Sequence, residues 1–104
     1  MNFKQNEYNE NKLNNRKTDD DYVAEKFRII KDSLACLSFF QFYYDGEFYR
    51  VDGLYKTVRI MHNGFEIKTV ATFKNYYDLL TLTFLDDMPF EKLVARDDFI
   101  ITAM

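Results

Sequence analysis

The amino-acid sequence predicts an α+β fold, in which an N-terminal amphipathic helix packs on an antiparallel meander of about four to five strands, with a second, C-terminal helix. One stretch repeats apolar residues at alternating spacings of four and three. Two dipeptides, Asp45-Gly46 and Asn63-Gly64, separate runs rich in aromatic and β-branched residues. With 104 residues, 47% of them hydrophobic and 18% aromatic, the chain suffices for one domain without disulfides or metals.

The helix is expected to begin at Thr18, whose hydroxyl can cap free backbone N–H groups. The carboxylates that follow it, Asp19 to Asp21, suit the positive end of a helix dipole. One continuous apolar stripe then runs through Val23, Phe27, Ile30, Leu34 and Leu37. Such a stripe must cover an apolar surface elsewhere in the domain.

Residues 1–17 are rich in Asn, Lys and Glu and hold too few apolar groups to offset the entropy of ordering them. We therefore expect a disordered polar tail there and a single α+β domain over residues 18–104. The alternative for the tail is an arm that folds onto a partner.

Four strands are expected in the meander: Phe39–Tyr44, Glu47–Asp52, Lys56–His62 and Phe65–Thr72. In the first hairpin, one face would carry Phe40, Phe42, Tyr49 and Val51. The second face would carry Phe39, Gln41, Tyr43, Phe48 and Arg50. In the second hairpin, a two-residue loop places Met61 opposite Glu66 and Arg59 opposite Lys68.

The C-terminal third is less regular. Phe73 to Leu85 fits both a helix and an alternating strand, and its length favours a helix. Asp86, Asp87 and Pro89 should end that element. Pro89 to Val94 is expected to form one helical turn, and Phe99 to Thr102 a final strand.

No catalytic, metal-binding or cofactor-binding set emerges from the sequence. His62 is the only histidine and is expected beside a tight turn at the edge of the core face. Cys36 is the only cysteine and is expected to be buried as a small hydrophobe. An enzymatic interpretation would have to rest on this pair, and we expect a protein that is not an enzyme and needs no cofactor.

Charge and targeting features place few limits on function. The net charge of −3 is too small to indicate a nucleic-acid or membrane partner by itself. The N-terminus lacks the apolar segment of a signal peptide, and no apolar run is long enough for a membrane span. With a single cysteine, the chain is expected to be cytoplasmic.

The feature most suggestive of binding is the second face of the predicted sheet. Its candidate partner-binding residues are Tyr43, Phe48, Arg50, Arg59 and Lys68. Exposed Tyr, Phe and Arg side chains are typical hot spots of protein interfaces. Single-stranded nucleic acid could also stack its bases on such aromatics while cations neutralise its phosphates. Alternatively, the second helix covers this face and turns its aromatics into core.

A second, acidic-aromatic surface could form from Tyr76, Tyr77, Asp86 and Asp87, together with Asp97 and Asp98. An acidic surface can imitate the charge of nucleic acid in a basic groove of another protein. The alternative is an ordinary solvated surface.

The expected function is therefore a protein-binding module that could also self-associate through its aromatic surface. In general character the chain resembles small proteins of phages and mobile elements, since it is short, polar-tailed and rich in Asn, Lys, Tyr and Phe. The resemblance implies an inhibitor or adaptor that blocks a host protein, such as a defence nuclease, in the host cytoplasm. The alternative is a single-stranded nucleic-acid-binding domain.

Overall fold

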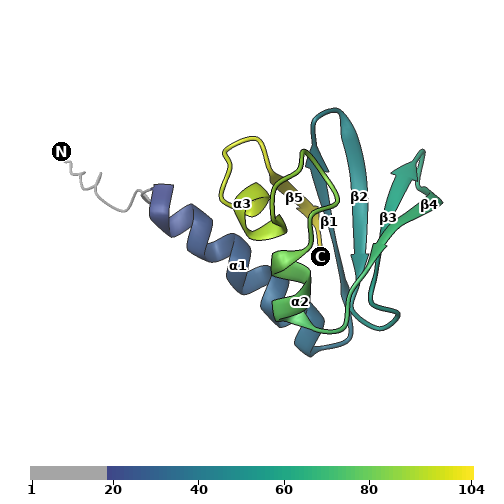
Figure 1. Ribbon diagram of the computed structural model, residues 1–104, viewed down its shortest axis with the longest axis horizontal. Coiled ribbons are helices and arrows are strands. Elements are labelled where there is room, and N and C mark those ends of the chain that lie inside the picture. Colours follow the sequence, from purple (N-terminus) through teal and green to yellow (C-terminus); the bar gives the residue numbers. More distant parts are fainter. Residues whose placement is uncertain (1–18) are drawn as a thin grey trace, which may run out of the picture.

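The computed structural model describes residues 19–104, so the predicted tail, residues 1–17, and the predicted cap Thr18 lie outside the described residues. Helices and strands are arranged as Figure 1 shows. In chain order they are α1 (Asp19–Ala35), β1 (Phe39–Tyr44), β2 (Glu47–Asp52), β3 (Thr57–His62), β4 (Phe65–Thr72), α2 (Tyr76–Thr81), α3 (Phe90–Val94) and β5 (Ile100–Ala103).

The strands form a single antiparallel sheet in the order β4-β3-β2-β1-β5. Strands β1 to β4 make the predicted meander, and β5 returns to pair with β1 at the other edge. Both hairpin turns have positive φ at their two central residues: 50° and 83° at Asp45 and Gly46, and 53° and 82° at Asn63 and Gly64. These angles are those of type I′ turns, which confirms both predicted hairpins.

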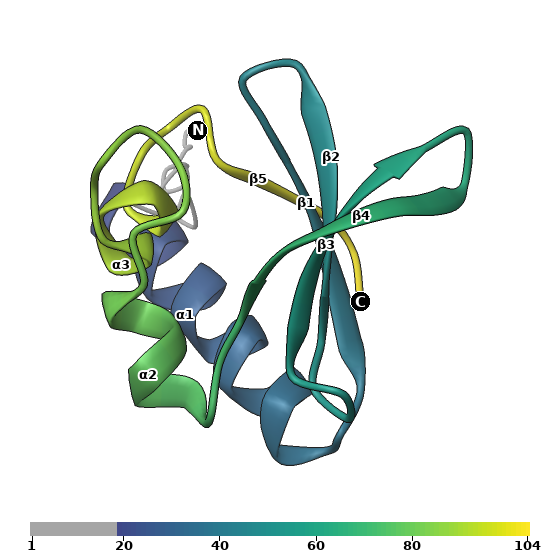
Figure 2. The same ribbon diagram turned by 45° about the vertical axis from the view of Figure 1, so that its right-hand side comes forward.

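All three helices lie on one side of the sheet (Figure 2). We call this the inner face and the opposite side the outer face. The second helix therefore joins α1 over the inner face and leaves the outer face without a helical cover. The molecule is an α+β sandwich of two layers, as the sequence predicts.

The core lies between the helices and the inner face. Phe42, which is fully buried, stands at its centre. Its ring stacks on Phe99 and Tyr49 with centroid distances of 4.5 and 4.9 Å, and lies 5.6 Å from the ring of Phe90. Such aromatic pairs contribute more than their buried area alone. The four inner-face residues predicted for the first hairpin are all buried: Phe40, Phe42, Tyr49 and Val51.

Helix α1 ends earlier than its apolar stripe suggests. Leu37 has a φ of 55° and is exposed, so its predicted place on the buried stripe is wrong. The N–H of Leu37 donates to the carbonyl of Leu34, and that of Ser38 to the carbonyl of Ser33. This pair of bonds is a Schellman cap, which requires a left-handed residue after the helix, and here leucine fills that position.

The predicted helix from Phe73 to Leu85 is shorter than expected. The Asn75 side chain caps α2 by accepting from the Asp78 N–H, and the helix ends at Thr81. Phe73 instead donates its N–H to the Lys56 carbonyl. The predicted turn at Pro89–Val94 is confirmed as α3, and the predicted last strand as β5.

Candidate functional site

The candidate site is the outer face across β1, β2 and β3. Strand register brings its side chains into adjacent rows, because successive residues of a strand alternate between faces. Gln41 lies opposite Arg50, which lies opposite Arg59; Tyr43 lies opposite Phe48, which lies opposite Met61. Four of the predicted partner-binding residues are therefore brought together: Tyr43, Phe48, Arg50 and Arg59.

The aromatic part of this face is accessible. The rings of Tyr43 and Phe48 lie 4.8 Å apart at their centroids and are tilted by 60°. Phe48 is 45% exposed, although it lies in the interior of a strand. A shallow hollow of about 400 Å³ opens beside it, lined by Gln41, Phe48, Arg50, Met61, Asn63 and Gly64. An exposed phenyl ring beside a hollow is the geometry of an interface anchor.

The cationic part of the face is a pair of facing arginines. The guanidinium carbon of Arg50 lies 3.9 Å from the centre of the Phe39 ring, a close cation–π contact. Glu66 lies between the two arginines: Oε1 is 2.9 Å from Arg59 Nε and Oε2 is 3.6 Å from Arg50 Nε. One carboxylate thus offsets the repulsion between two guanidinium groups that face each other across neighbouring strands.

Glu66 offsets the charge of the two arginines but does not satisfy their Nε–H donors. The Nε atoms of Arg50 and Arg59 are shielded from solvent and lack a hydrogen-bond acceptor within residues 19–104. The short contact between Glu66 and Arg59 is therefore an ion pair without hydrogen-bond geometry. Since buried donors normally have acceptors, this cluster is not saturated by the described part of the chain.

Lys68 does not belong to this face as predicted. It lies opposite Ile60 rather than Arg59, because β4 shifts register between Ile60 and Met61 and again between Val58 and Arg59. Each bulge inserts one extra residue into β4, so the side chains beyond it change faces. The predicted Met61–Glu66 pair near the turn is confirmed, but the Arg59–Lys68 pair is wrong.

The predicted acidic-aromatic residues occupy different surroundings. The Tyr44 hydroxyl donates a 2.6 Å hydrogen bond to Asp86 Oδ2, and this bond raises the pKa of Tyr44 to about 12. Asp87 is exposed in the turn that follows. Tyr76 and Tyr77 instead begin α2 and line a separate hollow.

The other two predicted acids lie beside Arg96. Arg96 donates to both carboxylate oxygens of Asp98, at 2.8 and 2.9 Å, and this pairing lowers the pKa of Asp98. Asp97 lies between Arg96 and Asp98 in the same loop. Asp86 and Asp98 thus both lie near Tyr44 and Arg96, whereas Tyr76 and Tyr77 line a hollow with lysines.

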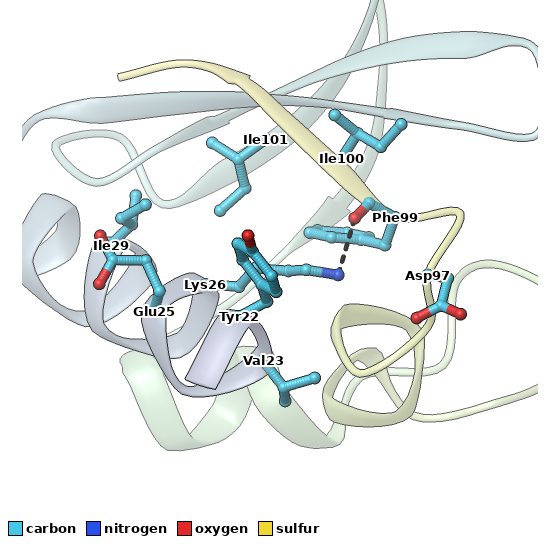
Figure 3. Close-up of a pocket in the computed structure, with 9 residues that line it drawn as sticks. All are labelled: Tyr22, Val23, Glu25, Lys26, Ile29, Asp97, Phe99, Ile100 and Ile101. Atoms are coloured by element: carbon cyan, nitrogen blue, oxygen red, sulfur yellow. Dashed lines mark hydrogen bonds between the residues drawn. The ribbon is translucent and has the colours of Figure 1, made fainter. Parts of the chain in front are cut away.

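A groove of about 370 Å³ between α1 and the edge strand β5 was not foreseen (Figure 3). Beside it, Lys26 Nζ donates to the carbonyls of Val94, Arg96 and Phe99 at 3.0, 2.7 and 2.9 Å. Burial lowers the pKa of Lys26, while Asp97 and Asp98 oppose that change. With all three ammonium protons engaged, Lys26 fastens α1 to the C-terminal segment. Its place off the apolar stripe gave no signal of this role.

The residues considered for catalysis are both at the surface. Cys36 is exposed, so its predicted burial is wrong, because the helix ends just before it. His62 Nε2 lies 2.8 Å from Oε1 of Glu47 on the neighbouring strand β2, and the pair is exposed. Within residues 20–104, no three His, Cys, Asp or Glu side chains are grouped to hold a metal ion.

None of the described helices has both the length and the apolar character needed to cross a bilayer. Comparison of the chain with protein-family models, with curated proteins and with solved structures gave no match.

Proposed function

We propose that the chain is a non-enzymatic protein-binding module that receives its partner on the outer face. The observation that carries the proposal is the exposed Phe48 ring, 45% accessible, on a sheet face that no described helix covers. Aromatic and arginine side chains at the centre of a patch carry a large share of binding energy in protein interfaces.

The charge balance of the face favours a protein over nucleic acid. Glu66 lies within 3.6 Å of both arginine Nε atoms, and Lys68 adds no cation to their row. Nucleic-acid affinity depends on the number of cations that neutralise phosphates, and two partly neutralised arginines are a weak basis for it. A protein surface can supply the carbonyl and carboxylate acceptors that arginines require.

The proposal extends to the kind of action. Its resemblance in general character to small phage and mobile-element proteins supports an inhibitor or adaptor that acts in the host cytoplasm by blocking a host protein, such as a defence nuclease. A module of this kind needs only a binding surface, which the outer face supplies.

The test is affinity purification of partners with the full chain from lysate of its native source, after nuclease treatment. We expect a stoichiometric protein that survives the nuclease, with affinity reduced at least about 30-fold by Phe48→Ala or Arg50→Ala. Phe65→Ala is the control, because Phe65 is an exposed ring that pairs with His62 and so lies on the face opposite Met61 and Glu66. Circular dichroism must show that all three variants are folded.

Two results would overturn the proposal. One is recovery of nucleic acid with loss of every protein after nuclease treatment, and the other is a partner whose affinity is unchanged by both outer-face variants. Sedimentation of the purified chain separates self-association from binding of another protein.

A further inference from the structure

Another hollow, of about 290 Å³, is lined by residues of α1, of α2 and of the loop between β2 and β3. Its wall is mostly apolar and aromatic, with Leu34 from α1, the buried Phe73, and Tyr76 and Tyr77 from α2. The two tyrosine rings meet edge to face with 5.3 Å between centroids, and Tyr77 is 69% exposed. The hollow thus combines a buried apolar wall with an accessible aromatic ring.

Three lysines complete the lining: Lys31 on α1, Lys56 in the loop and Lys74 ahead of α2. Among the described residues, no Asp or Glu lines the hollow. The Lys31 ammonium lies 5.9 Å from the centre of the Tyr76 ring. None of the three ammonium groups has a hydrogen bond or ion pair with residues 19–104. We call this feature the lysine–tyrosine hollow.

Two nearby carboxylates, Asp78 and Asp52, accept backbone N–H groups, and Glu91 lies close enough to contribute, after burial and Tyr77, to raising the pKa of Tyr76. Asp78 Oδ2 accepts the backbone N–H of Lys74 at 2.7 Å, which fixes the start of α2. Asp52 accepts the N–H groups of Leu54 and Tyr55 and so closes the loop between β2 and β3. The described lining itself carries three lysines and no carboxylate, in a chain whose net charge is −3, and such a lining favours an anionic ligand.

We infer that the lysine–tyrosine hollow binds an acidic segment of a partner protein. One large apolar side chain of that segment inserts against Phe73 and Tyr76, and carboxylates on either side of it pair with the lysines. Tyr77 covers the inserted side chain, since its ring is the accessible one.

The hollow has room for one large side chain. Its volume of about 290 Å³ lies at the lower end of the roughly 300–1,000 Å³ typical of ligand sites. A single anchoring residue buried in such a hollow can carry much of the binding energy of a peptide.

This site goes beyond the proposed function of the outer face. It shares no residue with that face and draws on α1, α2 and the loop between β2 and β3. Loss of binding at one surface therefore leaves the other testable, and Phe48→Ala should not affect binding in the hollow.

The test is selection from a random dodecapeptide library on the immobilised full chain. We expect enriched peptides that carry an aromatic or large aliphatic residue flanked by Asp or Glu. The best peptide is then synthesised and titrated by fluorescence anisotropy, and its contact surface is mapped by ¹⁵N–¹H NMR. Shifts should centre on α2 and the loop between β2 and β3, and affinity should fall as salt rises.

Variants separate this site from general charge attraction. The double variant Lys31→Gln/Lys74→Gln should weaken binding about tenfold, and Tyr77→Ala by a similar factor. Lys56 has a φ of 57°, so Lys56→Asn suits the backbone and removes charge without unfolding the domain; we expect about a threefold loss. Lys68→Gln removes an exposed lysine outside the hollow and should change affinity less than about twofold.

The inference is overturned by enrichment of neutral or basic peptides, by NMR shifts confined to the outer face, or by equal effects of Lys68→Gln and the double variant. It is also overturned if a single-stranded oligonucleotide competes for the hollow at lower concentration than the acidic peptide.

Discussion

The two hairpins of the meander begin alike and then differ. Both start from a type I′ turn. From there, β1 and β2 stay in register over every pair from Tyr44–Glu47 to Phe39–Asp52, whereas β3 and β4 lose register twice. The inner-face residues of the first hairpin are buried, while β4 is exposed from Phe65 through Thr69.

The difference lies in what covers each hairpin. The helices lie over β1 and β5, whereas the β3–β4 hairpin diverges from them (Figure 2). Register is strongly specified only where one face is buried, because a slip there would expose apolar side chains. In β4 little is lost by a slip, and its bulges also make an edge strand less able to pair with other chains.

The largest expected effect is the difference in stability between two variants that each remove one aromatic ring, one from each hairpin. Phe42→Ala should lower the free energy of unfolding by about 3–5 kcal/mol, because it leaves a cavity among the rings of Tyr49, Phe90 and Phe99. Phe65→Ala should change it by less than about 0.5 kcal/mol, since Phe65 is 73% exposed. Urea denaturation measures both. Similar losses would mean that β4 is packed as firmly as β1.

The next effect tests the helical cover itself. Lys26→Met removes donors from three carbonyls of the C-terminal segment and should cost roughly 2 kcal/mol. Hydrogen exchange should accelerate in α3, β5 and β1 but not at the β3–β4 turn. Lys31→Met, on the same helix with an exposed side chain, is the control and should change stability by less than about 0.5 kcal/mol. Uniform acceleration over both hairpins would contradict the proposed difference.

The sequence predicts strand pairing and side-chain placement best where turn chemistry and the pattern of burial agree. Turn dipeptides and alternation correctly predicted the first hairpin and the shared face of Tyr43, Phe48 and Arg50. The register of β4 could not be derived, because bulges depend on which face is covered, and Lys68 was therefore misplaced. Leu37 and Cys36 were misplaced because a leucine, instead of the usual glycine, adopts the left-handed cap of α1.

The lysine–tyrosine hollow could not be predicted from the sequence. Its lysines come from three separate segments that only the tertiary fold brings together. The side of the sheet taken by α2 was also undetermined, since its short apolar stretch fits either face. That choice decides whether Tyr43 and Phe48 are surface or core.

A smaller, pH-dependent effect distinguishes the turn end of β1. The Tyr44 hydroxyl donates to Asp86, and this bond raises the pKa of Tyr44 to about 12, above the ordinary value near 10. Because ionisation is favoured in the unfolded chain, stability should be unaffected below about pH 10 and fall as pH rises towards 12. Tyr44→Phe should flatten this fall in urea melts at each pH. Burial also raises the pKa of Tyr49, so some slope should remain.

A control for this experiment is Tyr55→Phe, which removes a hydroxyl from a ring that is 75% exposed. Its alkaline profile should match that of the unmodified chain. If Tyr44→Phe also left the profile unchanged, the bond to Asp86 would contribute nothing to the stability of the first hairpin.

The smallest expected effect concerns an ion pair between the tips of the two hairpins. His62 Nε2 lies 2.8 Å from Glu47 Oε1, and both side chains are more than a third exposed. A double-mutant cycle with His62→Gln and Glu47→Gln should give a coupling below about 0.5 kcal/mol, because solvent and salt screen such pairs. A coupling above about 1 kcal/mol would mean that the tips act as one unit. The contrast between a covered and an uncovered hairpin would then hold for packing but not for cooperativity.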